Sequence, residues 1–356
     1  MKWFLYQDSP FVFYPAQIVR LMKHSPMLLT TGLILSLSAC KTNPENTQSN
    51  QRVQQATPTD PLPSWNDGKV KQAIIDYVKT ITDSTGKNYI PVADRIATFD
   101  NDGTLWCEEP TIQVLFAMHQ VQKLVAANPA LAQKEPFKAV LEHDKAYFKK
   151  SGEEALVKLV GATHTGMTED DFEAAVKEFV TTVKVPPRNV GLRQITYQPQ
   201  IELLNYLRAN GFKTFICTGG TIEFVRSISD DLYGIPKNQV IGTSFKYAFV
   251  DSNRTLMRQP EIALLNDKAG KPAGIQLHIG QRPVFACGNE RSGGDIQMLM
   301  YAQSSPYKSM QLLVNHDDEV REAAYQEKDS ASLKAAAING WQVVSMKKDW
   351  KTIFPQ

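Results

Sequence analysis

Two aspartates separated by one residue are the clearest chemical signal in this sequence. Asp100 and Asp102 stand in the run Ile-Ala-Thr-Phe-Asp-Asn-Asp-Gly-Thr, where apolar residues give way at once to polar and turn-forming ones. This pattern is typical of a buried strand that ends in a loop. Two later apolar runs end in the same way, at Thr218-Gly219-Gly220 and at the stretch from Gly288 to Asp295.

These three loops should meet, although they are far apart in the sequence. In an open parallel sheet, the carboxyl ends of the strands line the ligand crevice. Together the loops supply carboxylates, a hydroxyl group, glycine amides and an amide side chain. That set of groups suits a divalent cation with oxygen ligands and a phosphate group beside it.

The elements that carry these loops alternate between strands and helices. Such alternation predicts an α/β fold, a Rossmann-like parallel sheet wrapped by helices. Residues 111–183 interrupt the pattern with apolar residues at helical spacing and a capping-box-like start at Thr168, which predicts an inserted helical cap. We expect strands at 96–99, 213–217, 240–242, 245–250, 283–287, 309–314 and 341–345, and helices at 70–81, 199–210 and 221–233.

The chain divides into four predicted parts. The core comprises residues 64–105 and 196–356, and the cap comprises residues 106–195. Residues 41–63 are rich in Gln, Asn, Thr and Pro with few apolar residues, which predicts a flexible tether. Residues 1–40 resemble a signal peptide with a natural start near Met22, because their apolar run is too short to span a bilayer.

The end of this signal carries a candidate lipidation site. The sequence Leu-Ser-Ala-Cys at Cys40 resembles a bacterial lipoprotein signal, in which the chain is cleaved before the cysteine and the sulfur is acylated. An ordinary cleaved signal and an uncleaved anchor are the alternatives. We therefore expect an exported protein on the periplasmic side, anchored to the membrane by lipid, with sorting to the outer membrane left open by Lys41.

Composition excludes other classes of protein. The formal net charge of +2 does not favour a nucleic-acid-binding protein. None of the six histidines forms a zinc-binding pattern, which argues against a zinc enzyme. Cys107, Cys217 and Cys287 are expected to be buried and free of disulfides.

The motifs together resemble the haloacid dehalogenase superfamily. They comprise Asp-x-Asp-Gly-Thr after a hydrophobic strand, a Thr-Gly-Gly loop, a lysine, and then Gly-Asn followed by an aspartate. The order is most similar to the phosphoserine-phosphatase-like branch, whose helical cap lies between the first two motifs. The resemblance covers roughly residues 64–350 and implies the same α/β fold with an inserted cap.

The resemblance also implies roles for individual residues. Asp100 would be the nucleophile that forms an aspartyl-phosphate, and Asp102 would be the general acid and base. Thr218 and the Gly219 amide would bind the phosphoryl oxygens. Lys271 would offset their negative charge, with Lys268 as the competing candidate.

A magnesium site is the implied cofactor site. Its ligands would be Asp100, Asp102 through its main-chain carbonyl, Asn289 and Asp295. This chain departs from the usual pattern, because the last two residues are six apart and the first of them is Asn instead of Asp. Either Gly293-Gly294 lets the longer loop deliver Asp295, or Glu290 or Ser292 reaches the metal.

The expected activity is hydrolysis of a small phosphorylated metabolite by a magnesium-dependent phosphomonoesterase. Asp102 argues against carbon–halogen cleavage, which needs no acid at that position. Glu109 matches a glutamate that holds the substrate's amine, although Glu108 and Glu109 also suit a solvated pair at a cap hinge. Two alternatives stay open: a catalytically weakened, membrane-tethered phosphate-binding module, and a haloacid dehalogenase-type hydrolase that cleaves a different bond.

Overall fold

The computed structural model describes residues 60–291 and 293–355. Cys40, the predicted signal and most of the predicted tether lie outside the described residues, as does Ser292. The end of the tether needs a correction, because Leu62 is fully buried and Asp60 forms an ion pair with Lys71 (Oδ2 to Nζ, 2.6 Å). Residues 60–63 therefore belong to the packed unit. No helix among the described residues is both long enough and apolar enough to cross a membrane.

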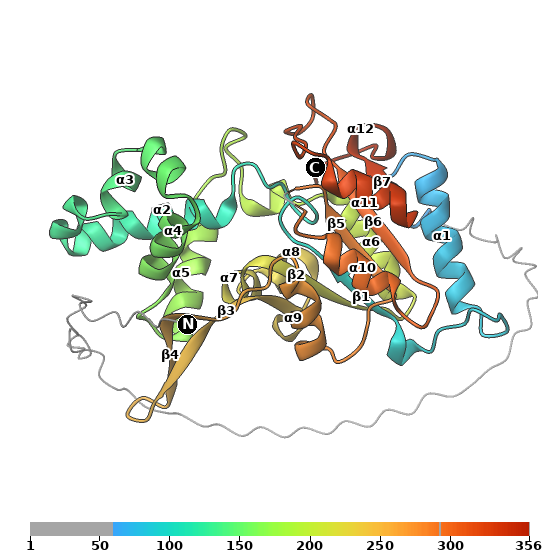
Figure 1. Cartoon of the computed structure of the whole chain (residues 1–356), viewed down its shortest axis with the longest axis horizontal. Helices are drawn as coiled ribbons and strands as arrows, with labels where there is room; N and C mark the ends of the chain where they lie inside the picture. The colour runs from blue at the N-terminus through green and yellow to red at the C-terminus, as the bar shows by residue number, and fades with distance from the viewer. Residues whose placement is uncertain (1–59, 292, 356) are drawn as a thin grey trace, which may run out of the picture. The chain divides into compact units, whose positions relative to one another are not determined.

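A single seven-stranded sheet organises the described part of the chain (Figure 1). Its order is β4-β3-β2-β1-β5-β6-β7, with β4 antiparallel to β3 and all other neighbours parallel. The predicted α/β class is confirmed. The strands are β1 Ile96–Phe99, β2 Lys213–Thr221, β3 Val240–Val250, β4 Thr255–Leu264, β5 Phe285–Asn289, β6 Met310–Asn315 and β7 Gln342–Ser345.

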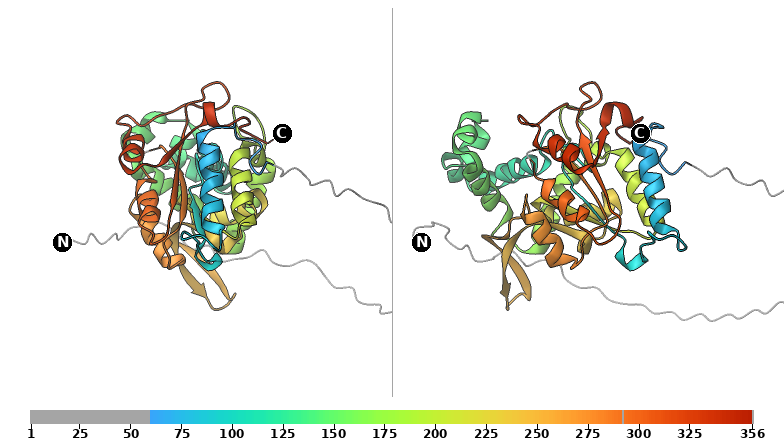
Figure 2. Two further views of the ribbon diagram at one scale, coloured as in Figure 1. Left: turned by 90° about the vertical axis from the view of Figure 1, so that its right-hand side faces the viewer. Right: turned by 45° about the vertical axis from the view of Figure 1, so that its right-hand side comes forward.

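Helices cover both faces of the sheet (Figure 2). Ile74 of α1 and Leu203 of α6 belong to the same apolar cluster as Ile216 of β2, whereas Ile275 of α9 clusters with the preceding strand residue, Phe215. Successive residues of β2 thus pack on opposite faces, as in buried parallel sheets. The core helices are α1 Lys69–Thr82, α6 Gln198–Ala209, α7 Ile222–Arg226, α8 Ser229–Tyr233, α9 Gly270–His278, α10 Ile296–Gln303, α11 Ala331–Asn339 and α12 Met346–Asp349.

The cap is helical, as the sequence predicts, and lies between β1 and α6 in chain order. The chain leaves the core and returns to it along neighbouring segments, where Cys107 N donates to Ile195 O (3.0 Å) and Tyr197 N donates to Leu105 O (2.9 Å). The Thr168 hydroxyl accepts a hydrogen bond from Asp171 N and caps α5. The cap helices are α2 Ile112–Ala127, α3 Phe137–Leu141, α4 Lys145–His164 and α5 Glu169–Thr182.

The β3–β4 hairpin differs from the expected pattern. The predicted strands 240–242 and 245–250 form one continuous strand, β3, and β4 was not expected because Pro260 interrupts its sequence. Proline is tolerated here because β4 is an edge strand. The predicted helix 221–233 is likewise divided into α7 and α8.

The hairpin also contacts the cap. Arg258 N in β4 donates to Met167 O, and Gly166 N donates to Arg258 O, both at 3.0 Å. The buried Arg258 guanidinium lies 3.8 Å from the ring centroid of Phe172 in the cap and 3.2 Å from Glu223 Oε2. The cap is therefore attached to the core at its root and again at the hairpin.

His164 is part of the cap interior. Its ring is fully buried, packs edge-on against Phe116 at 5.1 Å between centroids, and lies 2.8 Å from Thr163 Oγ1 through Nδ1. Burial, with the neighbouring Arg258 charge, lowers the pKa of His164 to about 3. The residue therefore stays neutral in the folded protein at ordinary pH.

This burial predicts a pH-dependent stability. Below the unfolded pKa of about 6.5 the unfolded chain binds a proton that folded His164 does not, so stability falls by roughly 1.4 kcal/mol per pH unit until about pH 3. Urea unfolding at pH 7.5 and 5.5 should show a smaller loss for His164→Gln than for the wild type. His143→Asn, which alters an exposed histidine, should keep the wild-type loss. An equal loss in all three proteins would contradict this assignment.

Candidate active site

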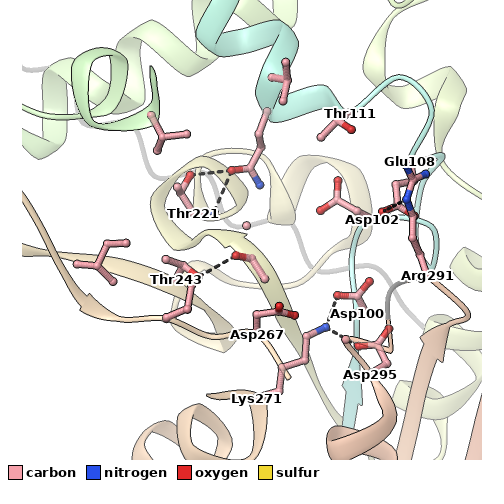
Figure 3. Close-up of a pocket in the computed structure, with 18 of the residues that line it drawn as sticks. Asp100, Asp102, Glu108, Thr111, Thr221, Thr243, Asp267, Lys271, Arg291 and Asp295 are labelled. Carbon is pink, nitrogen blue, oxygen red and sulfur yellow. Dashed lines mark hydrogen bonds and ion pairs between the residues drawn. The ribbon is translucent and has the colours of Figure 1, made fainter. Parts of the chain in front are cut away.

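The three predicted loops meet at the carboxyl ends of adjacent strands. β1 lies between β2 and β5 in the sheet, and Asp100 N continues the pairing by donating to Cys287 O at 2.9 Å. The strand ends therefore bring Asp100, Gly219 and Asp295 to one cavity of about 340 Å³ between core, cap and hairpin (Figure 3). The predicted convergence of the loops is confirmed.

Lys271 connects two of these loops. Its Nζ donates to Asp100 Oδ1 at 2.6 Å and to Asp295 Oδ1 at 2.5 Å, and all three side chains are buried. Burial opposes the charged form of Lys271, but the two carboxylates outweigh it and raise its pKa. The competing candidate Lys268 is exposed, so the structure places Lys271 against the predicted nucleophile.

The aspartates carry more negative charge than Lys271 offsets. Burial and the Asp295 carboxylate raise the pKa of Asp100 well above its ordinary value, although Lys271 opposes the rise. Burial also raises the pKa of Asp102, and the hydrogen bond from Trp106 Nε1 to Asp102 Oδ1 (2.9 Å) opposes it in part. A buried carboxyl group of this kind is suited to holding a proton.

The same excess of charge fits a divalent cation. In the part of the chain that the structure describes, no three His, Cys, Asp or Glu side chains form a ready-made metal cage. Asp100, Asp102, Asn289 and Asp295, which the resemblance implies as ligands, all line the cavity, and the groups it assigns to the metal are the two carboxylates of Asp100 and Asp295, the main-chain carbonyl of Asp102 and the side-chain oxygen of Asn289. All are oxygens, the ligands that magnesium prefers.

The lengthened loop does deliver Asp295. Asn289 N donates to Asp295 Oδ2 at 2.9 Å, so the loop folds back on the end of β5. A Cβ atom at Gly288 would lie 2.5 Å from Asp295 Cγ, so only glycine leaves room for this approach. Glu290, the alternative ligand, is not among the residues that line the cavity, and its Oε1 accepts a hydrogen bond from His316 N at 3.0 Å.

The second loop contributes its glycines to the cavity. Gly219 and Gly220 line it, whereas Thr218 is buried beside it and its hydroxyl accepts a hydrogen bond from Gly220 N (3.0 Å). Asn266 Nδ2 donates to Thr218 O at 2.8 Å and fixes the loop from below the cap. In this predicted phosphate-binding loop the two glycines line the cavity and the Thr218 side chain does not.

Glu108, rather than Glu109, lines the cavity. Its Oε2 accepts hydrogen bonds from Tyr325 OH (3.0 Å) and Asn289 Nδ2 (3.1 Å), and burial raises its pKa to about 7. Glu109 is not among the lining residues, and its carboxylate pairs with Arg291 Nη1 at 2.5 Å. The ion pair leaves Glu109 poorly placed for the amine-binding role that the resemblance implies.

The C-terminal segment supplies residues that the sequence interpretation missed. His316 Nε2 lies 2.7 Å from Gly103 O in the nucleophile loop, and the His316 ring stacks on Tyr325 at 4.2 Å. His316 directly follows β6, so the rule that identified the other loops could have identified this one. Tyr325 carries no comparable signal in the sequence.

Known proteins share this fold. A family model described as haloacid dehalogenase-like hydrolase matches residues 97–300, more than half of the chain. No curated protein sequence matches. Among solved structures, a conserved protein of unknown function from Anaerococcus prevotii DSM 20548 is 14% identical, with a TM-score of 0.52 over 80% of this chain and 94% of that chain.

Two further solved structures are more distant. A protein of unknown function from Bordetella pertussis Tohama I is 16% identical over 70% of this chain and 97% of that chain, with a TM-score of 0.47. A phosphoserine phosphohydrolase-like protein from Francisella tularensis subsp. tularensis SCHU S4 is 17% identical over 70% and 94%, with a TM-score of 0.39. At such identities the structural likeness concerns the fold alone. The family match itself spans the strands that carry Asp100, Thr218 and Asn289, and the chain therefore belongs to the haloacid dehalogenase-like hydrolase family.

Proposed function

We propose that this protein is a magnesium-dependent phosphomonoesterase that works through an aspartyl-phosphate on Asp100. The observation that carries the proposal is the buried group of Asp100, Lys271 and Asp295, with Asp102 two residues from the nucleophile. A carboxylate nucleophile, a neighbouring acid and a fixed cation are the parts that phosphoryl transfer requires.

The residues divide the reaction into two displacements. In the first, an Asp100 oxygen attacks phosphorus, the bond from phosphorus to the leaving oxygen breaks, and Asp102 donates its proton to that oxygen. In the second, Asp102 takes a proton from water, the water oxygen attacks phosphorus, and inorganic phosphate leaves Asp100. The buried carboxyl of Asp102, with its raised pKa, suits both proton transfers.

Two other groups would hold the charges in place. Lys271 Nζ neutralises part of the negative charge on the nucleophile and on the phosphoryl group. Asp100, Asp295, Asn289 and the main-chain carbonyl of Asp102 would hold the magnesium ion, which supplies further positive charge to the phosphoryl oxygens when bound.

Removing the nucleophile should abolish turnover. In an assay of p-nitrophenyl phosphate with magnesium, Asp100→Asn should reduce kcat by about a thousandfold or more, because the covalent step is lost. Asp251→Asn, at an exposed turn aspartate, should retain wild-type activity. Chelation with EDTA should stop the wild-type reaction and added magnesium should restore it. Release that is unchanged by Asp100→Asn would refute the proposal.

Displacing Asp295 should also impair the enzyme without unfolding it. Gly288→Ala places a Cβ atom 2.5 Å from Asp295 Cγ, and a shift of the carboxylate by about 1 Å should reduce kcat/KM on the order of a hundredfold. Gly161→Ala, where an added Cβ meets no atom within 4 Å, is the matched control and should be close to neutral. Full activity of Gly288→Ala would show that Asp295 is not needed in its present position.

We also propose that Cys40 anchors the protein to a membrane, as the lipoprotein-like signal suggests. In bacteria that express the full chain, Cys40→Ser should move the protein from the membrane fraction to the soluble fraction and abolish labelling with radioactive fatty acid. A variant that stays in the membrane and remains labelled would show that the anchor lies elsewhere.

A further inference from the structure

The cavity beside Asp100, Lys271 and Asp295 is lined by charged residues on one side and by apolar residues on the other. The loops of the core supply the charged residues Asp100, Lys271 and Asp295, which Figure 3 shows gathered together. The cap and the hairpin supply large apolar side chains. These are Val114, Val157 and Val160 from α2 and α4, Phe245 and Ile262 from β3 and β4, and Leu265 just after β4.

Several of these apolar side chains remain open to solvent. Val157 is 48% exposed, Ile262 is 38% exposed and Leu265 is 54% exposed, although each lines the cavity. Apolar groups scattered singly on a surface need no explanation, but a set gathered around one cavity marks a binding site for an apolar group. A ligand that covered them would remove this surface from water.

Two polar side chains on the same side, Gln113 and Thr243, use their oxygen atoms in hydrogen bonds within the protein. Gln113 Oε1 accepts hydrogen bonds from Thr221 N (2.9 Å) and Thr221 Oγ1 (2.8 Å). Thr243 Oγ1 donates to Gly219 O at 2.7 Å and accepts from Asn266 N at 3.1 Å. These oxygen atoms hold the hairpin and the cap against the core.

Two charged lining residues near the root of the cap, Glu108 and Arg291, lie against each other. Glu108 Oε1 lies 3.4 Å from Arg291 Nε, and the same guanidinium pairs with Glu109. Asp267 lies against Gly219, close to the predicted phosphate loop, because a Cβ atom there would be 3.7 Å from Asp267 Oδ1. The Glu108 and Arg291 charges therefore largely offset each other, and the Asp267 carboxylate lies beside the predicted phosphate loop.

We infer that the preferred substrate is a phosphomonoester of an apolar alcohol, with an alkyl or aryl leaving group that lies between the cap and the hairpin. This inference rests on the proposed phosphatase activity for the position of the phosphate. It contrasts with the amine-bearing substrate that the sequence suggested through Glu109. The cavity of about 340 Å³ is large enough to take such a group beside the phosphate.

The first test is a series of alkyl esters. With the full chain and magnesium, kcat/KM should rise by about two- to fourfold for each added methylene from methyl to hexyl phosphate, roughly a hundredfold in total. Propyl phosphate and 2-aminoethyl phosphate have the same shape and differ in charge. The kcat/KM for propyl phosphate should be about tenfold higher than that for 2-aminoethyl phosphate. The ammonium group of 2-aminoethyl phosphate would lose its hydration against an apolar wall.

The second test uses two residues of the same strand. Ile262 and Leu256 both belong to β4 and are both 38% exposed, but only Ile262 lines the cavity. Ile262→Asn should reduce the ratio of hexyl to methyl phosphate kcat/KM by about fivefold. Leu256→Asn should leave that ratio unchanged. Equal ratios in both variants and the wild type would overturn the inference.

A third test separates this inference from the proposed function. It measures by calorimetry the binding of methyl-, butyl- and hexylphosphonate. Phosphonates are not hydrolysed, so their affinities report on the cavity even if no ester is turned over. Affinity that rises with chain length supports the apolar site whether or not turnover occurs. Turnover that Asp100→Asn abolishes, together with equal affinities for all three phosphonates, would overturn the apolar site and leave the phosphatase intact.

Discussion

The buried ammonium group of Lys271 holds together two aspartates that would otherwise repel each other. It brings the start of α9 against the loops that follow β1 and β5, and Gly288 leaves the space in which Asp295 approaches. Loss of one partner from such a buried ion pair typically costs about 3–5 kcal/mol, because the remaining charges are uncompensated. The position of Asp100, the proposed nucleophile, and the fold of the loop that carries Asp295 therefore depend on the same side chain.

Two parts of the chain surround this ion pair, and we expect one to carry out the reaction and the other to select the substrate. In the proposed reaction the loops of the core would provide the groups that act on phosphorus, and they follow parallel strands whose positions the sheet fixes. The cap and the β3–β4 hairpin provide the wall that a leaving group would touch. Changes in the apolar residues of that wall could alter the substrate without disturbing Asp100 or its partners.

Much of this arrangement could be predicted from the sequence. Short apolar runs ending in Asp, Thr-Gly-Gly and Gly-Asn identified the strands, and the parallel-sheet rule brought their loops together. β4 could not be predicted from its sequence, because it contains Pro260. Proline is compatible with an edge strand, but the sequence does not show which strand lies at an edge. The choice between Glu108 and Glu109 depends on the direction in which each side chain leaves the backbone, and Tyr325 reaches the site only through tertiary packing.

The two attachments of the cap have a mechanical consequence. A cap joined only at its root could swing away from the core as a rigid body. Here the hydrogen bonds between Arg258, Met167 and Gly166 join the cap to the hairpin as well, so movement of the cap away from Asp100 would have to break these bonds or bend β3 and β4 outward with it. The second attachment would thus oppose the entry of leaving groups too bulky for the gap between cap and core, which a cap attached only at its root would not do.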